Sequence, residues 1–476
     1  MVVVSMRWLV ITQFISQIVR IIVTIYVIRH LENQHMGFVA LAQTITSFLE
    51  MFSTLGLNTA IISKPNLTRR DIANISGMVI LLNLSLAALV FAMSGVLADF
   101  YSTPELVSIL KFMSLGFVLS GFASVPIALM TKGMRFKEIS IIQVCASIAG
   151  ALSSFYLVNN GFLYWSIIGG GLVYIGVRSL MSMAMCGDFV MPRFSLTETR
   201  DHLNFGGYVM LGGLAWYTYT SLDVIIAGRF WSPELLGIYA VAVQLIVMPL
   251  NRISPLLKQV ALPAFSMTMV QNKQKFEPYL VKSLKSSMGI CLPLYLGMSA
   301  VALVLVPVVL GETWVRSALP LVCLCFAAPF RLYLELLTPP TVASGQPRQV
   351  LVNNLRITGV LGVCFLLSAG FFRQPLALAL VWMLVYPALS LWVSRGSCRV
   401  MEVDYRRIVG AFQVSAINSL VMWVVVQGFV MLAGNLIAPW LVLLLAILLG
   451  IGVFMLLTWF FDRSLLKEFS QLMKTR

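Results

Sequence analysis

Apolar runs of about 20 residues recur along the whole chain, and this feature restricts the fold more than any other. A run of this length crosses the hydrocarbon core of a bilayer as a helix, whereas a barrel strand needs only about 10 residues. Charged residues make up 11% of the chain, against roughly 25% in soluble domains. We predict an all-α polytopic membrane protein with fourteen transmembrane helices, at about residues 7–28, 37–60, 74–97, 107–130, 138–158, 162–185, 205–227, 235–257, 286–309, 318–338, 350–370, 376–394, 408–432 and 439–461.

The N-terminal run and the cysteines lead to two further expectations. The N-terminal run has no small-residue cleavage site, so we interpret it as a retained first span and not as a signal peptide. The seven cysteines lie mostly within apolar runs, and Cys323 and Cys325 have no histidine nearby in the sequence. We expect small core residues there, and no metal or disulfide.

The basic residues are unevenly distributed over the predicted loops. With a cytoplasmic N-terminus, the inside segments hold 23 Lys and Arg residues, and the outside loops hold only Arg29, Arg229, Arg316 and Arg373. This asymmetry predicts a multi-pass membrane protein with both termini in the cytoplasm. The net charge of +15 follows mainly from this topology, and we expect no nucleic-acid partner.

Nine ionisable residues lie within the predicted spans, where facing lipid would be costly. Six are basic and three are acidic: Arg20, Lys111, Arg178, Arg252, Arg331 and Arg356, and Glu50, Asp223 and Glu335. Lys111 and Arg252 are interpreted as snorkelling from span ends. Arg331 and Glu335 are four residues apart on one helix, so they either pair with each other or serve separate roles.

Two neighbouring spans each carry one polar stripe at helical spacing. The residues are Gln13, Gln17, Arg20 and Thr24 in the first span, and Gln43, Ser47, Glu50 and Thr54 in the second. Matching stripes indicate a wet interior surface that both helices share. The alternative is interhelical hydrogen bonding, which explains the Ser and Thr residues well. It explains Arg20 and Glu50 only if these two pair with each other.

The sequence contains an ungapped internal repeat with an offset of 200 residues. "VIRHLENQHMGFVALAQ" from Val27 matches "AGRFWSPELLGIYAVAVQ" from Ala227 at four residue pairs: Arg29 and Arg229, Gly37 and Gly237, Ala40 and Ala240, Ala42 and Ala242. We predict an N-lobe of helices 1–6 (1–200), a C-lobe of helices 7–12 (201–400), and helices 13–14 with a cytoplasmic tail (401–476). Parallel repeats are typical of transporters, whose substrate site lies between the halves.

Several motifs resemble one transporter family. They are "GRFWSPELLGIYAVAVQLIVMPLNRISPLLKQVALPAFS" after Asp223, "STLGLNTAIISKPNLTRRDI" after the second span, and "VPIALMTKGMRFKEISIIQ" after the fourth. Over residues 5 to 420 the chain resembles the polysaccharide exporters of the multidrug/oligosaccharidyl-lipid/polysaccharide superfamily, especially flippases of the colanic-acid, xanthan and teichuronic-acid kind. The resemblance implies a two-lobed fold with alternating access. It also implies that the protein lies in the bacterial cytoplasmic (inner) membrane and that the cargo is an oligosaccharide on undecaprenyl pyrophosphate.

The cargo chemistry assigns roles to the intramembrane residues. A pyrophosphate stripped of water needs cationic donors, and Arg binds phosphate in a bidentate manner without losing its proton. We expect Arg20, Arg178 and Arg356, and next Arg331, to bind it. Polar cavity lining is expected from Gln13, Gln17, Gln43 and Ser47. Trp216 and Tyr219 either stack on sugars or pack between helices. Asp223, Glu50 and Glu335 are alternative sites for coupling to H⁺ or Na⁺, and for Asp223 simple pairing with a basic residue is the competing account.

Other functions are less compatible with the sequence. A membrane glycan polymerase or glycosyltransferase would carry a large catalytic loop, and no predicted loop reaches about 30 residues. A multidrug exporter for organic cations would favour an acidic cavity. No P-loop motif occurs, so ATP is not expected as a direct energy source. We expect a transporter without enzymatic activity or cofactor, whose partners are the lipid-linked glycan, membrane lipids and the polymerase and export machinery of the same pathway.

Overall fold

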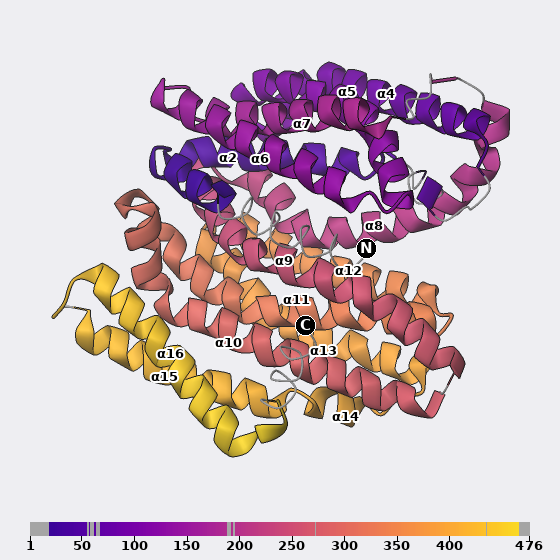
Figure 1. Ribbon diagram of the computed structural model, residues 1–476. Helices are drawn as coiled ribbons and strands as arrows, with labels where there is room; N and C mark the ends of the chain where they lie inside the picture. Colours follow the sequence, from indigo (N-terminus) through magenta and orange to yellow (C-terminus); the bar gives the residue numbers. More distant parts are fainter. Residues whose placement is uncertain are drawn as a thin grey trace. The chain divides into compact units, whose positions relative to one another are not determined.

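The computed structural model describes residues 19–54, 57, 61–62, 67–187, 192–193, 196–271, 273–434 and 436–465. Within these ranges the side chains of 196–212, 251–264, 266, 268–271 and 273 are not described. The described residues form helices and turns without any β-strand (Figure 1). Gln13 and Gln17 lie outside the described residues.

Eleven helical segments of the described chain are long and apolar enough to cross a membrane. Each coincides with one of the fourteen predicted spans, so the chain is a multi-pass membrane protein. Three predicted spans are not among these eleven. Span 7–28 lies mostly outside the described residues, span 37–60 overlaps helix α2 (Asn33–Glu50), and span 205–227 lies within α8 (Leu196–Phe230). The count of fourteen stays a prediction.

The chain forms two compact units, Met1–Gly237 and Ile238–Arg476. The first unit thus includes α8, which packs against α2 and α4. The predicted lobe boundaries at residues 200 and 400 were defined by the sequence repeat and not by compactness. They therefore stay a prediction.

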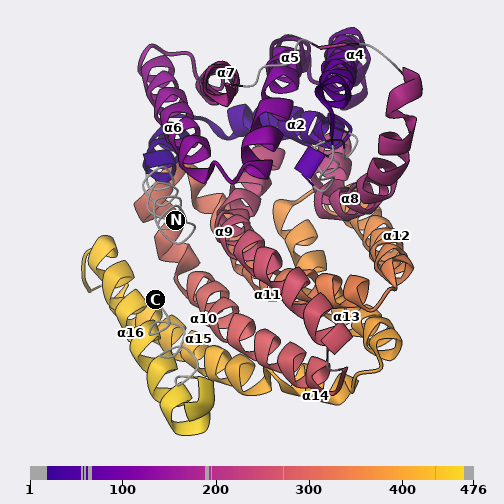
Figure 2. The ribbon, with the colours of Figure 1, turned by 45° about the vertical axis from the view of Figure 1, so that its right-hand side comes forward.

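The first unit is a bundle in which α4 packs along α5, and α6 along α7, as both ribbon views show (Figures 1 and 2). Helix α5 also packs against α7 and α2. Residues 19–29 form a further helix. The other helices of the unit, besides α2, α8 and the start of α9 (Pro233–Gln271), are α4 (Arg69–Tyr101), α5 (Glu105–Lys132), α6 (Phe136–Asn159) and α7 (Trp165–Cys186).

Two of the motifs in this unit form helix caps. Helix α4 begins at a reciprocal capping box, in which the Thr68 hydroxyl accepts a hydrogen bond from the Asp71 N–H and the Asp71 carboxylate accepts one from the Thr68 N–H. The Arg135 guanidinium donates to the backbone oxygens of Cys186 and Met185, at 2.8 and 2.9 Å, and to Glu138 at 3.1 Å. Arg135 therefore satisfies carbonyls at the C-terminus of α7, where the helix dipole also favours a cation.

The N-terminal turns of α2 and α9 meet in a reciprocal glycine contact within the first unit. A Cβ on Gly37 would overlap the Pro233 carbonyl, with its carbon only 2.7 Å away. A Cβ on Gly237 would overlap the Asn33 carbonyl, with its carbon 2.8 Å away. Adding 200 to 33 and 37 gives 233 and 237, so the two halves of this contact are repeat-related. Only glycine allows backbones to approach this closely.

The second unit is built around α10 and α11. Its elements after α9 are η1 (Lys273–Lys275), α10 (Phe276–Leu310), η2 (Glu312–Ser317), α11 (Ala318–Ala343), α12 (Pro347–Phe371), α13 (Pro375–Met401), α14 (Tyr405–Gly410), α15 (Gln413–Ala433) and α16 (Pro439–Phe461). Helix α10 contacts α11, α15 and α16, and α13 contacts α11 and α12. Within the core, the Tyr295 hydroxyl donates to the Ile246 oxygen at 2.8 Å.

A polar contact joins α10 to the end of α16. The Lys285 ammonium donates to Asp462 Oδ1 and to the Ser464 hydroxyl, each at 2.8 Å. Burial raises the pKa of the Asp462 carboxyl, but the hydrogen bonds from Lys285 and Ser464 and the Lys285 charge outweigh this, and the net pKa is lowered. The contact therefore favours the ionised carboxylate.

Candidate functional site

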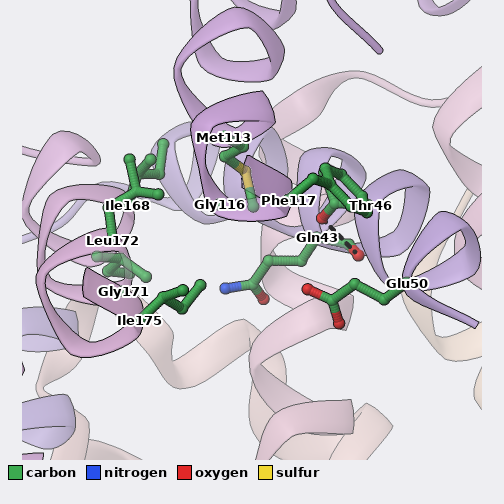
Figure 3. A pocket seen from close by; sticks show the side chains of 11 residues that line it. Gln43, Thr46, Glu50, Met113, Gly116, Phe117, Ile168, Gly171, Leu172 and Ile175 are labelled. Atoms are coloured by element: carbon green, nitrogen blue, oxygen red, sulfur yellow. Dashed lines mark hydrogen bonds between the residues drawn. The ribbon is translucent and has the colours of Figure 1, made fainter. Parts of the chain in front are cut away.

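A cavity of about 80 Å³ lies within the first unit, between α2, α5 and α7 (Figure 3). Its α5 and α7 walls are apolar or glycine, whereas α2 contributes polar groups. The lining residues are Gln43, Thr46, Glu50, Met113, Gly116, Phe117, Ile167, Ile168, Gly171, Leu172 and Ile175. This volume is large enough to admit water.

The polar wall of the cavity comes from the stripe predicted on the second span. Gln43 and Glu50 are seven residues apart, which places them on one face of α2. Figure 3 shows the Gln43 carboxamide and the Glu50 carboxylate extending into the same space. Thr46 donates its hydroxyl proton to the Ala42 oxygen at 2.8 Å, within its own helix. The carboxamide and the carboxylate are therefore the groups most able to bind a ligand or water.

Arg178 is the basic residue that this geometry associates with Glu50. It follows Ile175 by three residues and Gly171 by seven, so it continues the face of α7 that lines the cavity. Its side chain is exposed, and it interacts electrostatically with the Glu50 carboxylate. The pairing of Glu50 with Arg20 that the sequence left open stays a prediction.

Tyr217 on α8 connects this site to a second carboxylate, and the sequence analysis missed it. Its hydroxyl donates to the Thr44 oxygen of α2 at 2.8 Å. It also interacts with the hydroxyls of Ser47 and Ser221, and electrostatically with Glu50 and Asp223. The available signal was the i, i+4 spacing of Tyr217 and Ser221, which gives span 205–227 a polar face of its own.

The remaining candidates of the first unit differ in exposure. Asp223 is only 2% exposed, and the Val224 N–H donates to its Oδ1 at 2.8 Å. Tyr219 is 3% exposed, whereas Trp216 is 36% exposed. Arg20 is exposed on the helix of residues 19–29. Of these two aromatic candidates, Trp216 is therefore the more accessible one.

The basic candidates of the second unit lie over tryptophan rings. Arg331 and Glu335 are both buried on α11, and the Arg331 guanidinium carbon is 5.6 Å from the centroid of the Trp382 ring. Arg356 is exposed on α12, and its guanidinium carbon is 5.4 Å from the centroid of the Trp392 ring. Such cation–π contacts stabilise a guanidinium away from bulk water.

The described residues contain no group of three or more His, Cys, Asp or Glu side chains that could hold a metal ion. Among the three coupling candidates, only Glu50 lines the cavity. The structure thus brings Gln43, Glu50 and Arg178 together in one unit. The roles of these and the other candidate residues stay predictions.

Comparisons with known proteins agree with this architecture. The lipopolysaccharide biosynthesis protein WzxC of Escherichia coli (strain K12) is 26% identical over 294 residues, which are 61% of this chain and 59% of that protein. The succinoglycan biosynthesis transport protein ExoT of Rhizobium meliloti (strain 1021) is 23% identical over 291 residues, 60% of this chain and 58% of that protein. The chain thus spans somewhat more than half the length of these relatives.

A structural comparison and a family profile complete these findings. The lipid II flippase MurJ in an inward closed conformation aligns with a TM-score of 0.75 and 12% identity, over 96% of this chain and 99% of that one. This likeness confirms the predicted fold class. The profile of the family described as "Polysaccharide biosynthesis protein" matches residues 26–319. Because this match covers more than half of the chain, the protein belongs to that polysaccharide biosynthesis family.

Proposed function

We propose that this protein is a flippase for a lipid-linked oligosaccharide. It moves a repeat unit on undecaprenyl pyrophosphate from the cytoplasmic to the periplasmic leaflet of the bacterial inner membrane. The observation that carries the proposal is the family match over residues 26–319. The relative ExoT is a succinoglycan biosynthesis transport protein, which supports the proposal, as does the excess of arginine over carboxylate in the apolar spans.

The cargo is bound through its charged head and its sugars. Arg20, Arg178, Arg331 and Arg356 are the proposed pyrophosphate ligands, because guanidinium groups bind phosphate in a bidentate manner and stay charged. Trp216 is the proposed aromatic surface for a sugar, since its ring is partly exposed. The apolar carrier remains among membrane lipids.

Transport proceeds by alternating access and is coupled to a gradient of H⁺ or Na⁺. Asp223, Glu50 and Glu335 are the carboxylates that can carry the coupling ion. If Asp223 does so, Asp223→Asn should lower export more than Asp223→Glu. If both variants export at a near-normal level, Asp223 either pairs with a basic residue or has no role in transport. The proposed partners beyond the cargo are the polymerase and export machinery of the same pathway.

The test is complementation of a flippase-deficient strain, scored by surface polysaccharide and by the amount of protein in the membrane. Arg20→Lys should retain partial export, because a point charge still attracts phosphate. Arg20→Ala should lose most export and Arg20→Glu nearly all, at normal membrane abundance. Full export by Arg20→Ala would contradict the phosphate role, as would rescue by the double swap Arg20→Glu with Glu50→Arg.

The proposed orientation has its own test. The charge asymmetry places Gly311 outside and the C-terminal Arg476 inside. Reporter fusions that function in only one compartment should therefore give opposite results at the two positions. If both report the same compartment, the proposed topology is wrong.

A further inference from the structure

The exposed side of α12 and α13 changes from apolar to basic toward one end of the helix pair. Over most of their length the exposed side chains are apolar, and Val363, Leu367 and Leu384 are each more than half exposed. Toward the start of α12 and the end of α13 the exposed residues include Arg356, Trp392, Arg395 and Arg399. Such an order of apolar, aromatic and basic residues is typical of a helix surface that leaves the hydrocarbon core and enters the headgroup region.

The length of α13 places this change at the edge of the hydrocarbon core. The helix has 27 residues. At about 1.5 Å per residue it crosses a core of about 30 Å within about 20 residues of its start at Pro375, close to Arg395. Trp392 then lies just inside this edge, and Arg399 lies in the headgroup region. The charge asymmetry of the sequence assigns this end to the cytoplasmic side.

Two aromatic rings position the guanidinium groups of this surface. The Arg356 guanidinium carbon lies 5.4 Å from the centroid of the Trp392 ring, so this contact joins α12 to α13. The Arg395 guanidinium carbon lies 5.1 Å from the centroid of the Tyr405 ring. The Tyr405 hydroxyl donates to the Leu391 oxygen at 3.1 Å, which holds the ring against α13. Both cations are therefore restrained by the fold.

Hydrogen bonds hold α12 and α13 together at the same level. Asn353 Nδ2 donates to Ser397 Oγ at 2.9 Å, and Gln349 Nε2 donates to Asn353 Oδ1, also at 2.9 Å. Arg356 follows Asn353 by three residues, and Arg395 precedes Ser397 by two. The contact between the helices therefore keeps the two arginines on one continuous surface.

The ion pairs at this end of the unit involve a different arginine. Arg407 binds Glu277 at 3.1 Å and lies 3.9 Å from Asp404. In the part of the chain that the structure describes, neither Arg356 nor Arg395 forms an ion pair with a carboxylate. A ring contact neutralises no charge, and guanidinium N–H groups bind phosphate oxygens in a bidentate manner. A phosphate at the bilayer surface is the anion that suits both groups.

We propose that Arg356 and Arg395 bind the headgroup of an anionic phospholipid, such as phosphatidylglycerol, in the cytoplasmic leaflet. The acyl chains lie along the exposed apolar side of α12 and α13, which favours a lipid over a soluble phosphate. Basic sites between transmembrane helices on this side of a membrane suit anionic headgroups. The inference does not rest on the proposed function. Arg356 is also a proposed pyrophosphate ligand, and the phospholipid is its partner in the described conformation.

The test compares two phospholipids on the purified full chain. The protein is stripped of lipid in detergent, and the binding of dioleoyl phosphatidylglycerol or dioleoyl phosphatidylcholine is measured by native mass spectrometry. The wild type should bind phosphatidylglycerol about 10-fold more tightly than phosphatidylcholine, because two cations face the headgroup. The double variant Arg356→Gln with Arg395→Gln should lose this preference and keep its binding of phosphatidylcholine, which shows that it is folded.

Two further variants check the cause of the preference. Lysine at both positions should keep part of it, because lysine keeps the charge but not the planar fork of donors. The matched control is Arg229→Gln with Arg463→Gln, which removes two exposed arginines whose guanidinium carbons lie 5.4 Å from the Phe100 ring and 4.8 Å from the Trp459 ring. This control loses the same net charge and should keep the full preference.

The results that would overturn the inference are specific to this surface. They are equal binding of both lipids by the wild type, a preference that survives the Arg356→Gln and Arg395→Gln changes, and an equal loss in the control. Geranylgeranyl diphosphate, a soluble isoprenyl diphosphate, serves as a competitor. If an equimolar amount displaces phosphatidylglycerol from the wild type, the surface binds an isoprenyl diphosphate instead of a membrane phospholipid. Export is measured separately by complementation, so none of these results decides the flippase proposal.

Discussion

The reciprocal contact of Gly37 and Gly237 allows a quantitative prediction for the first unit. In Gly37→Ala the new methyl group meets the Pro233 carbonyl, which is backbone and cannot rotate away as a side chain would. Overpacking of this kind costs about 1–3 kcal/mol, and the rigid obstacle places the cost near the upper end. The better helix propensity of alanine offsets about 1 kcal/mol. The net loss expected is about 2 kcal/mol for either glycine.

The measurement is the apparent Tm of the detergent-solubilised protein at one fixed scan rate. For a unit of this size, 1 kcal/mol shifts Tm by about 2–4 °C, so each single variant should melt about 4–8 °C lower. The control is Gly95→Ala on α4, where a Cβ would meet nothing within 4 Å. This variant should match the wild type or melt slightly higher.

The double variant tests whether the two glycines share one contact. Once the first alanine has separated the ends of α2 and α9, the second has more space and should cost at least 1 kcal/mol less than it does alone. Full additivity, or single variants as stable as Gly95→Ala, would show that the helix ends do not pack as described.

Three further predictions concern helix ends. Arg135→Ala should destabilise the protein by about 1–2 kcal/mol, because the hydrogen bonds to the last carbonyls of α7 are lost from a side chain that lies partly in solvent. Arg135→Lys should have an intermediate stability. An unchanged Tm in both variants would contradict the role of Arg135 as a cap. Thr68→Ala should cost about 1 kcal/mol in the same assay, and Thr68→Ser should restore most of it. Asp462→Asn should be less stable than the wild type at neutral pH, because the lowered pKa of Asp462 reflects its contact with Lys285. The stability advantage of the wild type is complete above about pH 4 and should vanish as pH falls through the folded-state pKa of Asp462. A stability difference that stays constant down to about pH 3 would refute this role of the contact.

Much of the fold was predictable because hydrophobic length is a local property of the sequence. The apolar runs located eleven spans that the structure shows as helices. Ends were less predictable: α4, α10 and α9 extend well beyond the spans expected from hydropathy, because polar residues continue a helix outside the bilayer as readily as apolar ones do within it. A hydropathy window does not register that continuation.

Only the part of the candidate site that lies on a single helix, α2, could be predicted from the sequence. The stripe with Gln43 and Glu50 follows from spacing along α2, and the structure places both in one cavity. The association of Glu50 with Arg178 depends on how the fold places α2 and α7 around one cavity, although these helices are more than 100 residues apart in the chain. Tyr217 was missed for the same reason, since its bond to the Thr44 oxygen joins α8 to α2. Helical periodicity carries no information about such pairings.

The motifs that identify the family and the residues proposed to move its cargo are largely different sets. Thr68 with Asp71, and Arg135 with Glu138, belong to the quoted motifs, and in the structure they cap helices. Glu50 and Arg178 lie outside every one of those motifs. A cap is needed whatever the glycan, because helix ends leave backbone groups unsatisfied. Charges in a cavity must instead suit one cargo and one coupling ion. The family resemblance therefore identifies the scaffold, and cargo choice must be tested at Glu50 and Arg178 in this chain.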